Sequence, residues 1–312
     1  MQKGIWKTQE GDFEYRIDRK KDRSGEPWVT VTDYRGTYTE VHVPGKIEGI
    51  PVKALAKKTF LSRKNLKRAV LPEPLEEIGD WAFAYCTGLE SVWIPKKRIK
   101  LGSSIFMECP KIKKVYLYEP ELEKTAGEDE EQTAALLAAA AVLLDAEYLL
   151  DVQEAGTDSW MEKWDARMKT VMEAEDDEGY TKMILCGEED YGCSLEEFMK
   201  SKRKGKVRLA MLRLLNPAGL DEKNRMLWEQ YLLDHTKGCA SEETWEVLRE
   251  EHGYEEEYFK LFARIGGIRK ENFDALLLDM EGDYAEMKAF FINYKEKHIG
   301  GGNFFDTLSL DD

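Results

Sequence analysis

Apolar residues in the first third of the chain recur with a constant offset of 23 positions. The stretch IGDWAFAYCTGLESVWIP, which begins at Ile78, has counterparts that begin at Leu55 and Leu101. The apolar columns that the three copies share are Leu55/Ile78/Leu101, Phe60/Phe83/Phe106, Leu66/Leu89/Ile112, Ala69/Val92/Val115 and Leu71/Ile94/Leu117. A fixed period of about 20–29 residues with leucine-type spacing is typical of a solenoid, whose coils bury their apolar faces against one another. The sequence therefore predicts three stacked coils.

Within each copy the apolar spacing changes partway along the coil. The portion that reads L-x-x-V-x-I alternates like a short strand, whereas the portion that reads G-x-x-A-F-x-x-C fits a helical turn. We expect the strands to stack in parallel and the helical turns to pack Phe and Cys inward behind them. The residue between the two inward positions of each strand must point outward. The resulting outward column is His42, Val70, Trp93 and Tyr116.

The coils resemble the BspA-type leucine-rich repeat family, whose repeats read roughly I-G-x-x-A-F-x-x-C-x-x-L-x-x-V-x-I-P. The middle copy matches this pattern almost in full, and the resemblance covers about residues 41–118. The outer copies depart from it: Ala56 replaces the glycine and Arg63 the cysteine of the first copy, and Tyr118 replaces the proline of the last. The resemblance implies a leucine-rich solenoid, which is short enough to need a cap at both ends.

The residues that precede the coils read as β structure. FEYRID and PWVTVTDYRGTYTEVHVPGKIEGIPVKAL alternate apolar and polar residues, with Gly36, Gly45 and Gly49 as turn points. The VHVP segment, which contains His42, fits the strand of an irregular first coil. Such a lead-in would cover the open edge of the sheet, so residues 1–120 are expected to form one β-rich cap and leucine-rich-repeat domain.

Beyond Tyr118 the apolar spacing becomes helical almost to the end of the chain. An acidic segment with proline and glycine is expected to form a linker at 121–133, and residues 134–312 are expected to form an all-α domain. Helices are expected at 131–153, 158–174, 194–202, 206–215, 221–234, 242–252, 255–265, 271–280 and 284–297. The predicted fold class is therefore α+β and multidomain, with a short solenoid followed by a helical-repeat domain.

A fainter repeat lies near the end of the helical segment. The residues from Val247 match those from Leu276 at an offset of 29, through pairs such as Gly253/Gly282. The helix, glycine turn and helix of each copy resemble degenerate ankyrin repeats, although the T-P-L-H signature is absent. A general array of helical hairpins is the alternative interpretation.

Charge is distributed unevenly along the 312 residues. The net charge is −15, yet residues 1–120 hold 23 Lys and Arg against 16 Asp and Glu, and the remainder holds 23 against 45. The basic first part fits either a nucleic-acid face or an intramolecular contact with the acidic helical domain. We favour the contact between the two domains, so no nucleic-acid partner is expected.

Recognisable catalytic and metal-binding motifs are absent from the sequence. The four histidines lie too far apart in the chain for an H-x-x-x-H metal site, and there is no C-x-x-C pair, P-loop, G-x-S-x-G or G-x-G-x-x-G motif. No catalytic residue, metal or cofactor is therefore expected. Cys86 and Cys109 share one column and fit either a redox pair or small buried side chains, and we favour packing.

Three kinds of segment admit two interpretations each. The acidic LCGEEDYGC, residues 185–193, fits a divalent-cation site or the amide end of a helix, but it lacks the spacing of a calcium loop. The basic KSKRKGKVR, residues 200–208, fits a site for phosphate or an acidic partner, or neutralisation of the acidic segment before it. The glycine clusters at 265–268 and 299–303 fit phosphate binding or helix ends. We favour the structural interpretation in each case.

The segments that bear on location are unlike membrane elements. The N-terminal MQKGIWKTQEGDFEY is polar where a secretory signal needs an apolar core. The longest apolar run, Ala134 to Leu150, is too short to span a bilayer and contains Asp145 and Glu147. The chain is therefore expected to be cytoplasmic and not to bind a membrane. A surface location is expected instead if a leader has been removed.

The sequence favours a non-enzymatic interaction protein that binds a protein partner of unknown identity. The partner would contact the outward column of His42, Val70, Trp93 and Tyr116 or a groove of the helical repeats, since aromatic residues are enriched at protein interfaces. The column is otherwise expected to be covered by the helical domain. Two alternatives remain open: a surface adhesin or host-binding protein, which the family resemblance implies, and an enzyme with a site between the domains.

Overall fold

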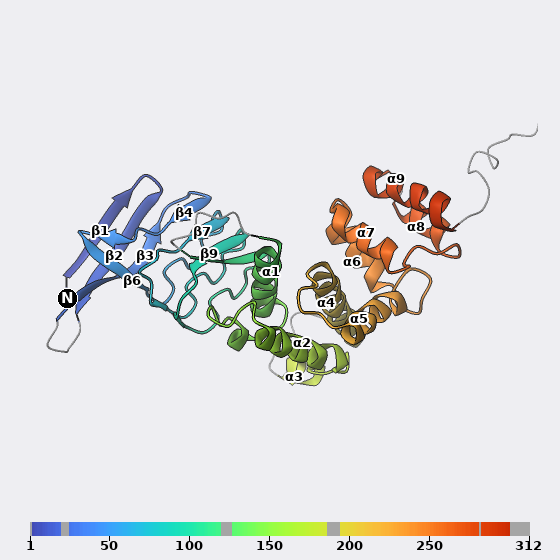
Figure 1. Cartoon of the computed structure of the whole chain (residues 1–312), viewed down its shortest axis with the longest axis horizontal. Coiled ribbons are helices and arrows are strands. Elements are labelled where there is room, and N and C mark those ends of the chain that lie inside the picture. The colour runs from blue at the N-terminus through green and yellow to red at the C-terminus, as the bar shows by residue number, and fades with distance from the viewer. Residues whose placement is uncertain (1, 20–24, 120–126, 186–193, 281, 300–312) are drawn as a thin grey trace, which may run out of the picture. The chain divides into compact units, whose positions relative to one another are not determined.

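The computed structural model describes residues 2–19, 25–119, 127–185, 194–280 and 282–299 (Figure 1). The chain forms two compact units, residues 1–169 and 170–312. The first unit contains the described strands, together with α1 (Glu128–Val142), η1 (Glu147–Leu149) and most of α2 (Asp158–Glu173). The described part of the second unit is helical.

The first unit begins with an antiparallel meander that continues into one sheet of the solenoid. In spatial order, this sheet contains β1 (Gln2–Thr8), β2 (Gly11–Arg19), β3 (Pro27–Arg35), β6 (Ile50–Leu55), β8 (Glu77–Ile78) and β10 (Lys100–Leu101), and β5 (Lys46–Ile47) pairs with β6. The alternation in FEYRID buries Phe13, Tyr15 and Ile17 in β2. Strand β3 is antiparallel to β2 and parallel to β6, so it joins the meander to the coils.

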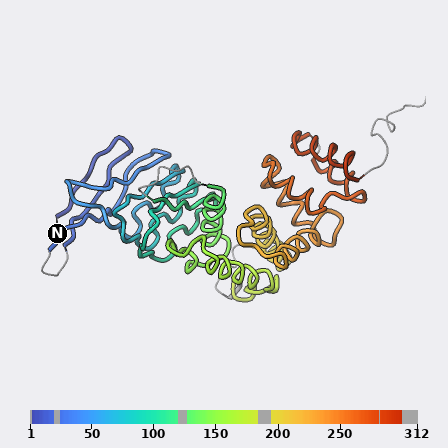
Figure 2. Tube along the Cα trace, in the orientation of Figure 1, coloured from blue at the N-terminus to red at the C-terminus, as the bar shows by residue number. Residues whose placement is uncertain are grey.

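A second, all-parallel sheet forms the other side of the coils. In spatial order, it contains β11 (Lys114–Tyr118), β9 (Ser91–Pro95), β7 (Arg68–Val70) and β4 (Glu40–His42). From β7 to β11 the strands pair residues 23 positions apart, such as Arg68 with Ser91 and Ser91 with Lys114. The 23-residue period is thus confirmed as one turn of a solenoid, and β4 supplies the irregular first coil. Figure 2 shows the coils stacked between the meander and α1.

A stack of aromatic rings runs through the interior of the solenoid. It consists of Phe13, Tyr34, Phe60, Phe83 and Phe106, with successive ring centroids 5.1, 5.2, 4.9 and 5.8 Å apart. All five side chains are buried, and aromatic pairs at such distances stabilise a core beyond the area that they bury. The expected phenylalanine column is confirmed. Phe13 and Tyr34 extend it into the meander, which therefore closes the first end of the array.

The segment that the sequence predicts as a helical turn in each coil is not helical. Lys58, Trp81 and Ser104 adopt left-handed φ angles of 66°, 57° and 53°, and a second left-handed residue follows four positions later in each coil. The amides of Phe60 and Phe83 donate hydrogen bonds of 2.7 and 3.0 Å to carbonyl oxygens of the next coil. Hydrogen bonds between coils therefore replace those of a helix, and the phenylalanines still point inward.

Helix α1 closes the other end of the solenoid. It packs against β11, and Leu137 of the helix lies with Val115 and Leu117 around one small apolar void. The indole of Trp164 in α2 donates a hydrogen bond of 3.0 Å to the carbonyl oxygen of Leu136, so α2 in turn holds α1. Both ends of the array are therefore covered, as a short repeat array requires.

The limits of α1 differ from those expected. The helix expected at 131–153 ends at Val142, because Asp145 adopts a left-handed φ of 47° and turns the chain back. At its other end α1 begins at Glu128, inside the segment expected to be an acidic linker at 121–133. The described part of that segment is thus mostly helical and belongs to the cap of the solenoid.

The second unit contains the remaining described helices. They are α3 (Tyr180–Leu185), α4 (Leu195–Leu215), α5 (Glu222–Asp234), α6 (Glu243–His252), α7 (Glu256–Arg264), α8 (Phe273–Asp279) and α9 (Ala285–Tyr294), with a π-helical turn, η3 (Lys295–Ile299), after α9. The sequence does not predict α3. The helices expected at 194–202 and 206–215 are one continuous helix, α4, because a single glycine, Gly205, weakens a helix without breaking it.

Helices α6 to α9 form two consecutive hairpins. Helices α7 and α9 begin 29 positions apart, and the two hairpins turn near Gly253 and Gly282. The rings of Phe262 and Phe291, which the sequence repeat aligns, are both buried and lie with centroids 6.0 Å apart. The expected helix–turn–helix repeat is therefore present.

Candidate functional site

Strand pairing brings the residues of the outward column together in one row. His42 pairs with Val70, Val70 with Trp93, and Trp93 with Tyr116, across β4, β7, β9 and β11. We call these four residues the outward row. The positions before them on each strand are buried, whereas the row is exposed at His42 and half-buried at the other three residues. The alternation of side chains along a pleated strand accounts for this difference.

Trp93 and Tyr116 form the most constrained part of the outward row. Their rings are stacked, with centroids 4.3 Å apart and planes inclined by 22°. The guanidinium of Arg68, on the neighbouring strand β7, lies 5.0 Å from the centroid of the Trp93 ring. Stacking and cation–π contacts of this kind restrict the movement of both rings. The two aromatic residues therefore present a preformed surface.

Tyr116 is tied to α1 through Glu131. Its hydroxyl donates a hydrogen bond of 3.1 Å to Oε2 of Glu131, and Nζ of Lys114 lies 3.2 Å from the same oxygen. Burial, together with the hydrogen bond to Glu131, raises the pKa of Tyr116 to about 12. The phenol therefore stays neutral near pH 7, and α1 fixes one end of the outward row.

Tyr118 lies beside the outward row but is not among the residues that the sequence predicts for the site. Its hydroxyl donates a hydrogen bond of 2.5 Å to the carbonyl oxygen of Leu71, which lies two coils away. Burial raises the pKa of Tyr118. The sequence contains a signal for this residue, because Tyr118 stands where the repeat has proline and pairs with Pro95 in the structure. At this proline position, the longer side chain of Tyr118 reaches across the neighbouring coil to Leu71.

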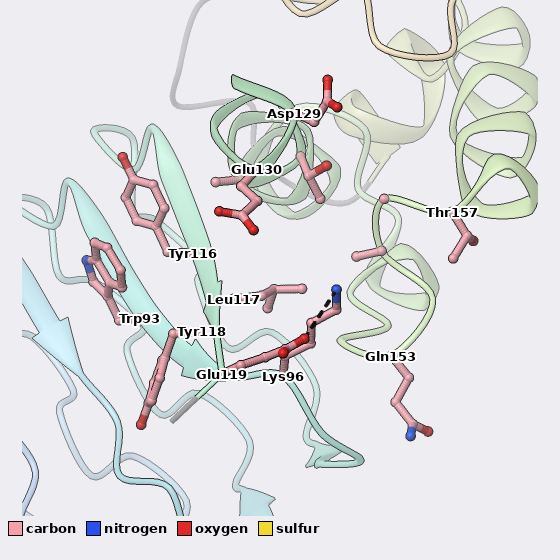
Figure 3. Close-up of a pocket in the computed structure, with 14 residues that line it drawn as sticks. Trp93, Lys96, Tyr116, Leu117, Tyr118, Glu119, Asp129, Glu130, Gln153 and Thr157 are labelled. Atoms are coloured by element: carbon pink, nitrogen blue, oxygen red, sulfur yellow. Dashed lines mark ion pairs between the residues drawn. The ribbon is translucent and has the colours of Figure 1, made fainter. Parts of the chain in front are cut away.

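A cavity of about 300 Å³ lies beside the outward row (Figure 3). Trp93, Tyr116 and Tyr118 line it from the sheet, and α1 and the loop before α2 supply the facing wall. The polar residues around it are Lys96, Glu119, Asp129, Glu130, Thr133, Gln153 and Thr157. The cavity thus joins an aromatic wall to a polar wall within the first unit.

His42 lies at the other end of the outward row and does not line this cavity. Its Nδ1 lies 3.0 Å from Oε1 of Glu10, and its Nε2 lies 3.6 Å from Oε1 of Glu40. Val70 separates His42 from Trp93 in the row. The part of the outward row that adjoins the cavity is therefore the stacked aromatic pair.

Comparison with known proteins identifies the repeats. Residues 49–127 match the family described as BspA type Leucine rich repeat region (6 copies). These residues are a BspA-type leucine-rich repeat region. No ankyrin family is identified in the helical second unit. No curated protein matches the chain.

Two solved structures are similar to part of the chain. One is a leucine-rich repeat protein of T. pallidum, with 25% sequence identity and a TM-score of 0.30, over 35% of this chain and 49% of that one. The other is a leucine-rich cell surface protein of Faecalibacterium prausnitzii A2-165, with 21% identity and a TM-score of 0.30, over 37% of this chain and 30% of that one. The chain thus spans about half the length of the first protein and less than a third of the second.

Cys86 and Cys109, which share one column of the leucine-rich repeat region, are buried free thiols. Burial raises the pKa of Cys86 to about 11 and that of Cys109 to about 12. A thiol that keeps its proton is a poor nucleophile and a poor redox group. Their environment therefore supports the packing interpretation.

The basic run at 200–208 pairs with glutamates of α6. Nζ of Lys200 lies 2.7 Å from Oε1 of Glu246, and Nη2 of Arg208 lies 2.6 Å from Oε1 of Glu251. The core of the acidic segment that we expected this run to neutralise, 186–193, lies outside the described residues. The basic run thus holds α4 to α6 through ion pairs within the second unit.

Of the two glycine clusters, the one at 265–268 follows the end of α7. Gly266 there adopts a left-handed φ of 86°, so the cluster ends the helix as expected. The cluster at 299–303 lies outside the described residues, except for Ile299.

Within the ranges that the structure describes, there is no group of three or more His, Cys, Asp or Glu arranged to hold a metal ion. In the same ranges, no helix has the length and apolar character needed to cross a membrane.

Proposed function

We propose that the chain is a non-enzymatic interaction protein that binds another protein through the outward row, with Trp93 and Tyr116 at the centre of the contact. The observation that carries this proposal is the stacked, half-buried pair of rings beside a cavity. Tryptophan and tyrosine are enriched among the residues that contribute most to binding energy. The part of each ring that the fold leaves uncovered is apolar area that a partner can bury.

The proposal is supported by how firmly the rings are held. The backbone of both residues lies in paired strands, Arg68 lies against Trp93, and Glu131 accepts a hydrogen bond from Tyr116. Ordering one flexible side chain on binding costs about 0.5–1.5 kcal/mol. A partner that docks on this pair avoids most of that cost, because the rings already have the conformation that they present.

The chemistry around the pair supports binding rather than catalysis. The described lining of the cavity contains no serine, cysteine or histidine, from which activated nucleophiles are most often built. The Tyr116 phenol has a pKa of about 12 and therefore cannot serve as a base near neutral pH. The remaining polar groups are suited to holding a ligand by hydrogen bonds and charge.

The helical hairpins offer a second surface for the same function. Hairpin α6–α7 and hairpin α8–α9 repeat along the second unit, and the rings of Tyr254 and Tyr284 at their turns lie with centroids 4.9 Å apart. This contact joins the turns of successive hairpins. Binding through these hairpins is the alternative to binding through the outward row.

Affinity capture tests the proposal. The tagged full-length chain, the variant Trp93→Ala/Tyr116→Ala and the control Tyr148→Ala are each incubated with a lysate of the source cell. The captured proteins are then quantified by mass spectrometry. Tyr148 is 64% exposed and does not line the cavity beside the outward row, so the control removes an exposed aromatic ring elsewhere in the first unit.

We expect at least one protein to be captured by the intact chain and the control and to be lost from the double variant. Circular dichroism of all three proteins checks that the substitutions leave the fold intact. Recovery of the same proteins at equal yield from all three would show that the outward row is not the binding face. The helical hairpins would then be the next surface to alter.

A further inference from the structure

The cavity beside the outward row has an excess of negative charge. Its described lining contains three carboxylates, Glu119, Asp129 and Glu130, and one cationic group, Lys96. Nζ of Lys96 lies 3.9 Å from Oε1 of Glu119, so it neutralises at most one of the three. Figure 3 shows Glu119 beside Lys96, and it shows Glu130 projecting from α1 toward the sheet.

Two described cationic side chains next to the cavity are already paired. Lys114 lies 3.2 Å from the carboxylate of Glu131, and Arg68 lies 3.4 Å from that of Glu40. The amino end of α1 contributes roughly half a positive charge, which the two negative charges of Asp129 and Glu130 outweigh. A group that enters the cavity therefore meets a net negative potential.

We infer that the partner inserts a lysine or arginine side chain into this cavity, from an extended segment whose neighbouring apolar side chain contacts Trp93. This inference rests on the proposed binding function and adds the chemistry of the partner. A volume of about 300 Å³ is at the lower end for ligand pockets, so one long side chain suits it better than a helix. The cation contacts Glu119 and Glu130, and its aliphatic stem lies along Tyr116.

Short synthetic peptides test this inference without knowledge of the natural partner. Three peptides of alternating leucine and a second residue, which is arginine, glutamine or glutamate, are titrated against the full-length chain by fluorescence anisotropy. We expect the arginine peptide to bind most tightly and the glutamate peptide most weakly. Raising the ionic strength from about 0.01 M to about 0.15 M shortens the Debye length from about 30 Å to about 8 Å. This change should weaken the binding of the arginine peptide far more than that of the glutamine peptide.

Charge-removing variants locate the binding site of the arginine peptide. Glu119→Gln/Glu130→Gln removes two carboxylates of the cavity, and glutamine can still accept the hydrogen bond that Glu130 accepts from the Gly127 amide. The control Glu26→Gln/Glu108→Gln removes two exposed carboxylates that do not line the cavity. We expect the first variant to bind the arginine peptide about tenfold more weakly than the intact chain does, because each exposed ion pair strengthens binding by a few-fold. The affinity of the control for this peptide should stay within about twofold of that of the intact chain.

The variant Trp93→Ala separates this inference from the function on which it rests. It removes the aromatic surface without a change in charge, so it should weaken all three peptides. If the arginine and glutamate peptides bind equally, or if the two charge variants behave alike, the inference of a basic partner is wrong. Loss of the glutamine peptide in Trp93→Ala would still support the outward row as the binding face. Failure of the arginine peptide to bind the intact chain also overturns the inference, and the capture experiment tests the function independently.

Discussion

The thiol of Cys86 donates a hydrogen bond of 3.0 Å to the carbonyl oxygen of Phe60, which lies in the preceding coil. Cys109 repeats this contact one coil later, with Sγ 3.1 Å from the carbonyl oxygen of Phe83. A carbonyl oxygen has two acceptor sites, and the carbonyl of Phe60 also accepts from the amide of Arg63. The thiol thus fills the second site, and the cysteine column links successive coils beside the aromatic stack.

Neither of these thiols should react while the protein is folded. The reactive species is the thiolate, and burial raises the pKa of Cys86 to about 11 and that of Cys109 to about 12. Cys239, which is half-buried, provides an internal comparison. At a mildly alkaline pH, we expect iodoacetamide to label the more accessible Cys239 in the folded chain and the two coil cysteines only after unfolding. Mass spectrometry of each peptide checks this, and labelling of Cys86 as fast as Cys239 would contradict a packing role.

Phe83 lies in the middle of the aromatic stack, so its removal should affect the coils on both sides. Its ring centroid lies 4.9 Å from that of Phe60 and 5.8 Å from that of Phe106. Phe83→Ala leaves a cavity in a packed core and should lower the free energy of unfolding by about 3–5 kcal/mol. Hydrogen exchange followed by mass spectrometry measures the loss of stability within the coils alone. A local measurement is needed because a chain of two units does not have to unfold in a single step. The exposed Tyr148→Ala should change exchange little, and unchanged exchange in Phe83→Ala would argue against a shared core.

The solenoid can be predicted from the sequence because every coil repeats the same packing. A column such as Phe60/Phe83/Phe106 must stay apolar at a fixed period, so periodic burial leaves a direct trace in the sequence. The outward row follows from the same register, since alternation along a strand fixes the direction of each side chain. The sequence register therefore predicts that Trp93 and Tyr116 lie side by side.

The local backbone and the cavity could not be predicted in this way. The left-handed residues Lys58, Trp81 and Ser104 are not the glycine or asparagine that usually mark this conformation. Asp145, which turns the chain back after α1, lies in an apolar run that reads as continuous helix. Glu130 lines the cavity only because α1 packs against β11, and no local pattern encodes that tertiary contact.

Gly79 and Gly205 should respond in opposite ways to replacement by alanine. A Cβ atom on Gly79 would lie 2.5 Å from the amide nitrogen of Lys57 and 2.6 Å from the carbonyl carbon of Ala56, both in the preceding coil. Backbone atoms cannot move aside without displacing that coil, so Gly79→Ala should destabilise the solenoid by about 1–3 kcal/mol. A Cβ atom on Gly205, inside α4, meets nothing within 4 Å. Gly205→Ala should therefore stabilise its helix by about 0.5–1 kcal/mol.

Hydrogen exchange of the two glycine variants measures both effects. Each variant controls for the other, since the chemical change is the same methyl group in a coil contact or in open space. We expect faster exchange across the coils in Gly79→Ala and slower exchange in α4 in Gly205→Ala. Equal protection of the coils in Gly79→Ala and the intact chain would show that the coils tolerate a wider separation.

Arg208 and Glu251 should make the stability of the second unit depend on pH. Nε and Nη2 of Arg208 lie 2.7 and 2.6 Å from the two carboxylate oxygens of Glu251. Burial acts to raise the pKa of Glu251, but the hydrogen bonds from Arg208 outweigh it, so this pKa lies below its usual value of 4.5. A carboxyl whose pKa is lower in the folded state stabilises the fold fully above the unfolded pKa, and this stabilisation is lost as pH falls through the folded pKa.

The variant Arg208→Ala should therefore be less stable than the intact chain by about 1 kcal/mol near pH 7. The difference should begin to shrink as the pH falls below about 4.5 and should disappear below the lowered folded-state pKa of Glu251, where its carboxyl is protonated in both proteins. Urea unfolding followed by far-ultraviolet circular dichroism, at a series of pH values, measures the difference. Lys223→Ala removes an exposed cation from α5 and should change stability by less than about 0.5 kcal/mol at every pH. A difference between Arg208→Ala and the intact chain that stays constant with pH would mean that Arg208 acts through packing of its aliphatic stem, because packing does not titrate.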